Sequence, residues 1–124
     1  MRVLENVASA MGENGKPPVS VVLLPEEIDM TNAEDVAKQL RDAFEPGVKV
    51  VIADLTKTRF CDSAGVRGLT LVHQRAAASG SRLNLAVAAD GPVSRVLHLM
   101  DLISVLNVFT SVEAAVAAAS SGGQ

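Results

Sequence analysis

The run VKVVIADL at residues 48–55 constrains the fold most, because it is short, rich in β-branched residues and carries few charges. Such a run is typical of a strand that is buried on both faces, as in a parallel sheet. Further strand-like runs and segments with apolar residues at helical spacing alternate with it along the chain. The strands are expected at 19–24, 83–88 and 105–109, and the helices at 33–44, 63–79, 93–100 and 114–119.

This alternation predicts an α/β fold, because strands joined by helices form largely parallel sheets with right-handed crossovers. We expect a four- or five-stranded mixed sheet with a parallel centre, and about four helices mainly on one face. The 124 residues fit one domain, residues 1–124, with a core at about 19–119 and a frayed tail at 120–124. The first fifteen residues suggest a weak edge strand that turns at residues 12–15.

Composition excludes several classes of function. Eleven Lys and Arg residues against fourteen Asp and Glu give a formal charge of −3, without a basic cluster that would follow a phosphate backbone, so no nucleic-acid partner is expected. The single cysteine, Cys61, excludes an internal disulfide and a cysteine-rich zinc site. There is no run of about 18 apolar residues, and the start of the chain lacks a basic segment followed by an apolar stretch, so we expect a cytoplasmic protein without a membrane span. We also expect no metal and no cofactor.

The stretch FCDSAG at residues 60–65 lies where a strand gives way to a helix, which is where α/β proteins gather functional groups. It half-matches the nucleophile elbow of serine hydrolases, but Cys61 occupies the position of the required glycine. His73 lies ten residues along the same expected helix and cannot face back to Ser63, and His98 has no supporting context. Serine hydrolysis is therefore a remote alternative, and we expect no enzymatic activity.

The string IADLTKTRFCDSAGVRGL at residues 52–69 resembles the signature of STAS domains of the anti-sigma factor antagonist family. Upstream, Glu27-Ile28-Asp29 and Thr31-Asn32-Ala33 resemble the family's Gly-Glu-Leu-Asp motif and the helix opening after it. The chain departs from the pattern in two places. Glu26 replaces the glycine of the first motif, and Ala64 replaces the second serine of the signature.

The resemblance implies a phosphorylation switch at Ser63, the serine that directly follows the aspartate. The unphosphorylated form would bind an anti-sigma factor, which is an ATP-dependent serine kinase, and so free a sigma factor. Phosphorylation would reverse this, and a serine phosphatase would restore it. The implied partner-binding residues are Asp29, Asp62, Ser63, Ala64, Gly65 and Arg67. A STAS scaffold subunit without a switch, within a stress-signalling complex, is the alternative.

The residues themselves leave other roles open. Ser63 fits a helix N-cap, a role that is compatible with phosphorylation because a helix start suits a phosphate. Asp62 fits a loop or capping group better than a catalytic base, and Asp29 fits either a cap or a partner contact. Cys61 fits a small apolar residue better than a redox sensor, and Arg67 fits a solvated charge or a pair with an acidic partner.

Overall fold

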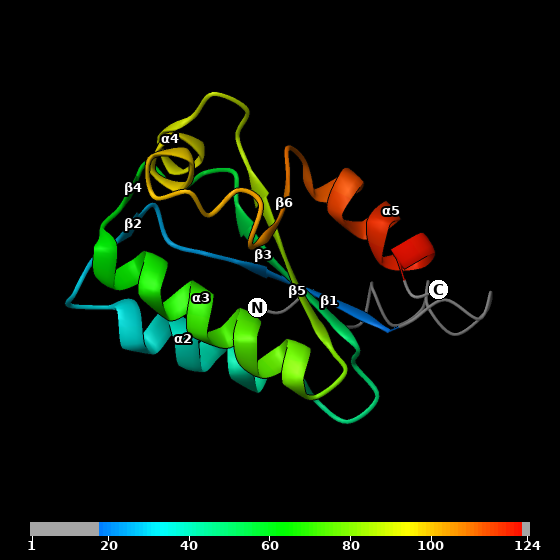
Figure 1. Ribbon diagram of the computed structural model, residues 1–124. Coiled ribbons are helices and arrows are strands. Elements are labelled where there is room, and N and C mark those ends of the chain that lie inside the picture. The colour runs from blue at the N-terminus through cyan, green and yellow to red at the C-terminus, as the bar shows by residue number, and fades with distance from the viewer. Residues whose placement is uncertain (1–17, 123–124) are drawn as a thin grey trace.

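The computed structural model describes residues 18–122, and its centre is a four-stranded parallel sheet in the order β1-β3-β5-β6 (Figure 1). The strands are β1 (Val19–Leu23), β3 (Val50–Leu55), β5 (Arg82–Val87) and β6 (Asn107–Phe109). The register places Val50 opposite both Val19 and Arg82, so β3 has a neighbour on each side. The prediction that residues 48–55 supply an interior strand is confirmed.

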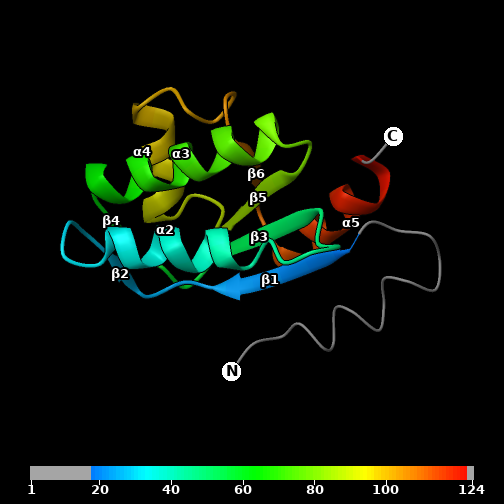
Figure 2. The same ribbon diagram turned by 90° about the horizontal axis from the view of Figure 1, so that it is seen from below.

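In the described part of the chain, four helices cover the two faces of this sheet: α2 (Ala33–Asp42), α3 (Ser63–Ala78), α4 (Pro92–Leu99) and α5 (Val112–Gly122). The first three share one apolar core with the sheet, whereas α5 packs on the opposite face, as Figures 1 and 2 show. The expected arrangement of about four helices mainly on one face is therefore confirmed.

The two-residue period of β3 explains how one strand serves both faces. Val51, Ala53 and Leu55 belong to the core beneath α2, α3 and α4. Val50 and Ile52 face the other way and pack with α5 through Ala115 and Ala119. The low aromatic content is consistent with these small contacts, because alanine side chains let α5 approach the sheet closely.

Three features differ from or extend the sequence predictions: a second sheet, a longer α5, and described strand pairs that are all parallel where a mixed sheet was expected. A second, two-stranded parallel sheet pairs β2 (Glu27–Ile28) with β4 (Phe60–Cys61), and the sequence did not predict it. Helix α5 continues through residues 120–122, which were expected to fray. All described strand pairs are parallel, and the edge strand expected in the first fifteen residues lies outside the described residues.

Candidate functional site

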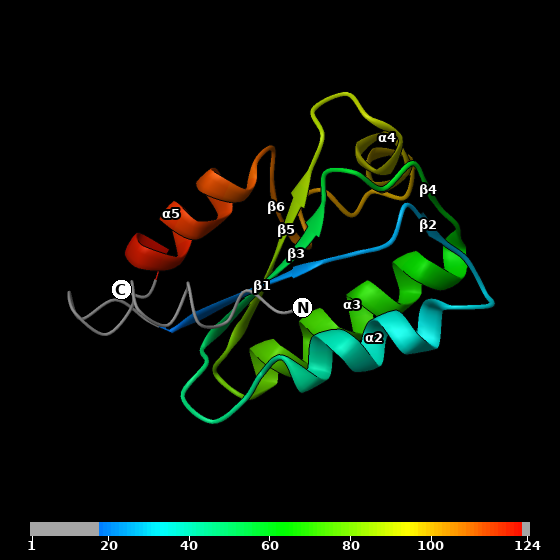
Figure 3. The ribbon, with the colours of Figure 1, turned by 180° about the vertical axis from the view of Figure 1, so that it is seen from behind.

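The small sheet of β2 and β4 joins the two halves of the sequence motif at one end of the molecule, beside the start of α3 (Figure 3). Ile28 pairs with Cys61, and the backbone N–H of Asp62 donates to the Ile28 carbonyl at 3.0 Å. The buried Thr58 hydroxyl ties the preceding loop to the Pro25 carbonyl at 2.8 Å. Asp29 and Asp62 therefore follow adjacent strand ends, although the chain separates them widely.

Asp62 is the N-cap of α3, and Ser63 is the first residue of the helix. The Asp62 carboxylate accepts a hydrogen bond from the Gly65 N–H at 3.0 Å, which satisfies one of the free donors at the helix start. The expectation that Ser63 fits the N-cap is thus wrong, because Asp62 takes that role. Ser63 is exposed, and the described part of the chain offers its hydroxyl no hydrogen-bond partner.

Asp29 organises the loop between β2 and α2. Its carboxylate accepts hydrogen bonds from the backbone N–H and the hydroxyl of Thr31, at 2.9 and 2.5 Å. Both bonds lower the pKa of Asp29 below its ordinary value of 3.8, and the bond from the Thr31 hydroxyl has the larger effect. The Asn32 side chain closes the loop from the other side, because it accepts from the Asp29 N–H and donates to the Glu27 carbonyl. Asp29 is therefore a loop-forming carboxylate, held in its charged form at the site.

Gly65 allows α3 to approach the small sheet. A Cβ atom at this buried position would lie 2.6 Å from Cys61 Sγ and 2.7 Å from Ile28 Cγ2. Cys61 is 4% exposed, and burial together with the charge of Asp62 raises the pKa of its thiol to about 11. A thiol with such a pKa stays protonated near neutral pH, so Cys61 acts as a small apolar residue. Ala64 is half-buried in the same turn.

Arg67 is exposed on α3, one helical turn after Ser63, and forms no ion pair with another described residue. Residues four apart on a helix lie on one face, so Arg67 is the cation of α3 that best reaches a group on Ser63. Of the sequence-predicted residues, Asp29, Asp62, Ser63 and Arg67 all offer polar groups at this end of the domain. Gly65 contributes through packing.

Sequence reasoning missed two apolar side chains beside these residues. Met30, directly after Asp29, is 80% exposed, and Phe60 on β4 is 49% exposed. Large exposed hydrophobic residues beside a polar site are typical of surfaces that bind another protein. The signal in the sequence was that Met30 stands between Asp29 and Thr31, and that Phe60 follows the polar residues 56–59.

The other candidate groups have separate local roles. The Asp54 carboxylate accepts from the backbone N–H and hydroxyl of Thr56, at 3.0 and 2.6 Å, and so closes the turn after β3. His98 Nδ1 lies 2.9 Å from the Ser94 carbonyl oxygen on its own helix. Within residues 18–122, no group of three or more His, Cys, Asp or Glu side chains is arranged to hold a metal ion. No helix in that range is both long and apolar enough to cross a bilayer.

Solved structures with the same fold have varied descriptions. An anti-sigma factor antagonist from Mycobacterium paratuberculosis matches with a TM-score of 0.72 and 21% identity, over 82% of this chain and 85% of that chain. A sulfate transporter family protein from Wolinella succinogenes matches with a TM-score of 0.66 and 20% identity, over 82% and 84%. The Bacillus cell fate determinant SpoIIAA in its phosphorylated form matches with a TM-score of 0.57 and 24% identity, over 82% of this chain and 92% of that chain. At these identities the likeness shows a shared fold.

The family assignment rests on the sequence as well as the fold. Residues 13–115, which include both strands of the small sheet and all of α3, match the family model described as STAS domain. The chain therefore belongs to the STAS domain family.

Proposed function

We propose that this protein is an anti-sigma factor antagonist whose unphosphorylated form binds an anti-sigma factor with serine kinase activity. Binding would release a sigma factor, phosphorylation of Ser63 would prevent binding, and a serine phosphatase would restore it. The protein would act in the cytoplasm as a binding module without catalytic activity. Its contact surface would include Asp29, Asp62, Ser63, Ala64 and Arg67, with Gly65 supporting the turn.

The main support for this proposal is the Ser63 hydroxyl, which is exposed and has no hydrogen-bond partner among residues 18–122. A serine that caps a helix has its oxygen engaged with the backbone, but here Asp62 performs the capping and Ser63 stays exposed. A kinase can therefore reach the hydroxyl without first breaking a hydrogen bond to the described part of the domain. The similarity to solved structures of anti-sigma factor antagonists supports the partner class.

A phosphate on Ser63 would leave the fold intact. It adds about −1.5 to −2 charges at pH 7, beside the positive end of the α3 dipole, which favours an anion by about 0.3–1 kcal/mol. Arg67 lies one turn away on the same helix face and adds attraction, whereas the Asp62 carboxylate opposes it. Since these effects are small and partly cancel, we expect little change in stability.

The same phosphate would weaken partner binding strongly. At an interface, the charge must lose its water against whatever packed on the hydroxyl, and this costs several kcal/mol without a matching cation on the partner. A loss of about 3 kcal/mol corresponds to more than a hundredfold in affinity. The switch would therefore act through the contact surface rather than through unfolding.

The partner kinase is first recovered from the native cytoplasm, with the unphosphorylated protein as bait. After incubation with this kinase and ATP, intact mass should show one added phosphate, and Ser63→Ala should show none. Modification of Thr56, Thr58 or Thr70 instead would contradict the assignment. If the partner binds but never phosphorylates Ser63, the protein is a scaffold without this switch.

Titration of the partner with Ser63→Asp then separates the contact effect from unfolding. We expect at least a hundredfold weaker binding and a melting temperature within a few degrees of the unmodified protein. Ser104→Asp is the matched control, since Ser104 is exposed and the substitution adds the same charge at a residue outside the proposed contact surface. Unchanged affinity for Ser63→Asp would remove Ser63 from the interface.

A further inference from the structure

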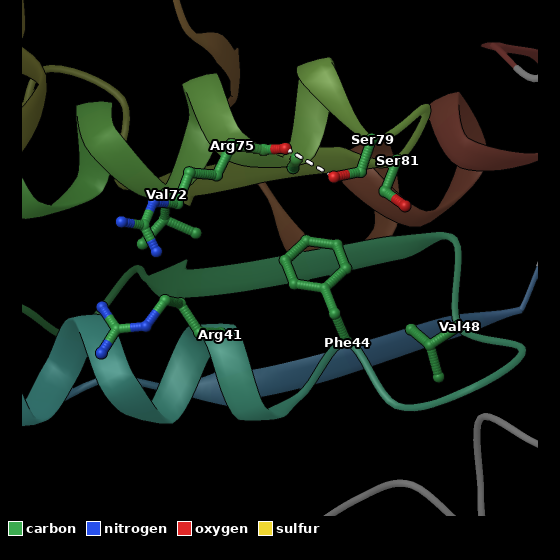
Figure 4. Close-up of a pocket in the computed structure, with 8 residues that line it drawn as sticks. Arg41, Phe44, Val48, Val72, Arg75, Ser79 and Ser81 are labelled. Atoms are coloured by element: carbon green, nitrogen blue, oxygen red, sulfur yellow. Dashed lines mark hydrogen bonds between the residues drawn. The ribbon is translucent and has the colours of Figure 1, made fainter.

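A groove follows the seam between α2 and α3, on the outer surface of the helical layer. It consists of two adjoining hollows of about 310 and 280 Å³, which share Arg41, Val72 and Arg75. Figure 4 shows both guanidinium groups at one end, the Phe44 ring in the middle, and Ser79 and Ser81 toward the other end. None of these side chains belongs to the site around Ser63.

The middle of the groove is apolar. Val72 and Ala76 are 2% and 6% exposed and belong to the wall that α3 presents, and the half-buried Phe44 and Val48 line the opposite side. An aromatic ring that is only half-buried at a hollow still has a face available for packing. The groove therefore offers an apolar surface of the kind that lines small-molecule sites.

The described residues neutralise the charged end only in part. Within residues 18–122, Arg41 has one acidic partner, Glu34, at 3.4 Å; Glu34 lines the second hollow, and its side chain is 87% exposed, so water screens this pair. Arg75 forms no ion pair with another residue in the described range. Two guanidinium groups that share a hollow repel each other, and an anion between them would relieve this repulsion and accept hydrogen bonds from both. Arginine is well suited to carboxylate and phosphate groups because its donors form a planar fork.

We propose that this groove binds a small amphipathic anion, with its carboxylate or phosphate head between Arg41 and Arg75 and its apolar body against Phe44. A volume near 300 Å³ lies at the lower end of ligand pockets, so a compact molecule fits best. Arg75 is twelve residues after Ser63 on α3, which corresponds to roughly 18 Å along the helix. The site is therefore separate from the proposed switch.

The test is a titration of the labelled protein by amide NMR with 4-phenylbutyrate and, separately, with phenyl phosphate. We expect saturable shifts confined to residues 41–48 and 68–81 with at least one of these probes, and the better probe identifies the head group. The neutral analogue 4-phenylbutanol and acetate alone should bind at least tenfold more weakly, because each lacks one half of the recognised chemistry. Equal binding of 4-phenylbutanol would overturn the proposal, as would shifts located elsewhere in the domain.

Substitutions of the two arginines test where the anionic head group of the ligand binds. Arg41→Gln and Arg75→Gln should each weaken binding of the better probe by roughly ten- to a hundredfold, which is the range for a lost charge-assisted hydrogen bond. Both side chains lie at the surface, so these variants should fold. Arg59→Gln is the matched control, because Arg59 is 71% exposed and does not line the groove. An equal loss in Arg59→Gln would show that only net charge matters and would refute the site.

Discussion

Replacing Gly65 with alanine tests whether the close approach of α3 to the small sheet holds the candidate site together. The added Cβ would lie 2.6 Å from Cys61 Sγ and 2.7 Å from Ile28 Cγ2, both well below the 3.4 Å at which ordinary contact begins. Neither neighbour can move into solvent, because Cys61 is 4% exposed and Ile28 is fully buried. The substitution must therefore displace β2, β4 or the first turn of α3.

Two effects of opposite sign set the magnitude. Overpacking a closed core costs about 1–3 kcal/mol, and two short contacts with fixed neighbours favour the upper part of that range. Alanine in a helix gains about 1 kcal/mol over glycine. The free energy of unfolding should therefore fall by about 1–2 kcal/mol, which lowers the melting temperature by roughly 4–8 °C for a domain of this size.

Gly68→Ala is the matched control on the same helix. Its Cβ would meet the Ala33 carbonyl oxygen and Ala37 Cβ at 3.7 Å, which is ordinary van der Waals contact. Only the gain in helix propensity of about 1 kcal/mol then remains, so Gly68→Ala should raise the melting temperature by roughly 4 °C. Thermal unfolding by circular dichroism measures both variants.

A double-mutant cycle attributes the cost to the contact. In a Cys61→Ala background, the Sγ atom is absent, and Gly65→Ala should be less destabilising than in the parent protein. If Gly65→Ala is as stable as Gly68→Ala, or its cost is unchanged without Cys61, the packing account of this glycine is refuted.

Four further predictions concern side chains of the same site. Asp62→Ala should lower the free energy of unfolding in urea by about 0.5–2 kcal/mol through loss of the cap, whereas Asp62→Asn should retain most of it; equal losses would contradict the capping role. Thr31→Val should raise the pKa of Asp29 toward 3.8 in an NMR titration, and a pKa that stays unchanged would argue against the hydroxyl as the main cause. Because the folded pKa is lowered, the Asp29 contribution to stability should be present above about pH 3.8 and disappear as the pH falls through the folded value. Cys61, with a pKa of about 11, should react with iodoacetamide at pH 8 far more slowly than in the urea-unfolded chain, and equal rates would show an accessible thiolate.

The main elements could be predicted because their patterns are local. Residues 48–55 show a continuous apolar run, and β3 occupies Val50–Leu55 between two parallel neighbours. The helical spacing after Asp62 likewise corresponds to α3, Ser63–Ala78. Element ends were less accurate, since helix ends depend on caps and on packing beyond the window of the pattern. The extension of α5 to Gly122 is an example.

The candidate site was predicted only in part. The signature identified Ser63, Asp62 and Asp29, but it left open which of the first two caps the helix. The small sheet was missed because strands of two residues have no periodicity to detect. The groove between α2 and α3 was also not predictable, because Arg41 and Arg75 meet only when the two helices pack side by side.

The sequence by itself determined the order of the main strands and the helices, the interior position of β3 and the family motif, because each depends on residues that are neighbours along the chain. Tertiary structure alone decided whether Asp62 or Ser63 serves as the N-cap, that β2 pairs with β4 beside Ser63, and which arginines share a groove. The physical reason is that these features arise from contacts between distant segments: the Asp62 N–H with the Ile28 carbonyl, and Gly65 against Cys61 and Ile28. Such contacts form only when the core has closed, and with Asp62 as the cap the Ser63 hydroxyl remains exposed.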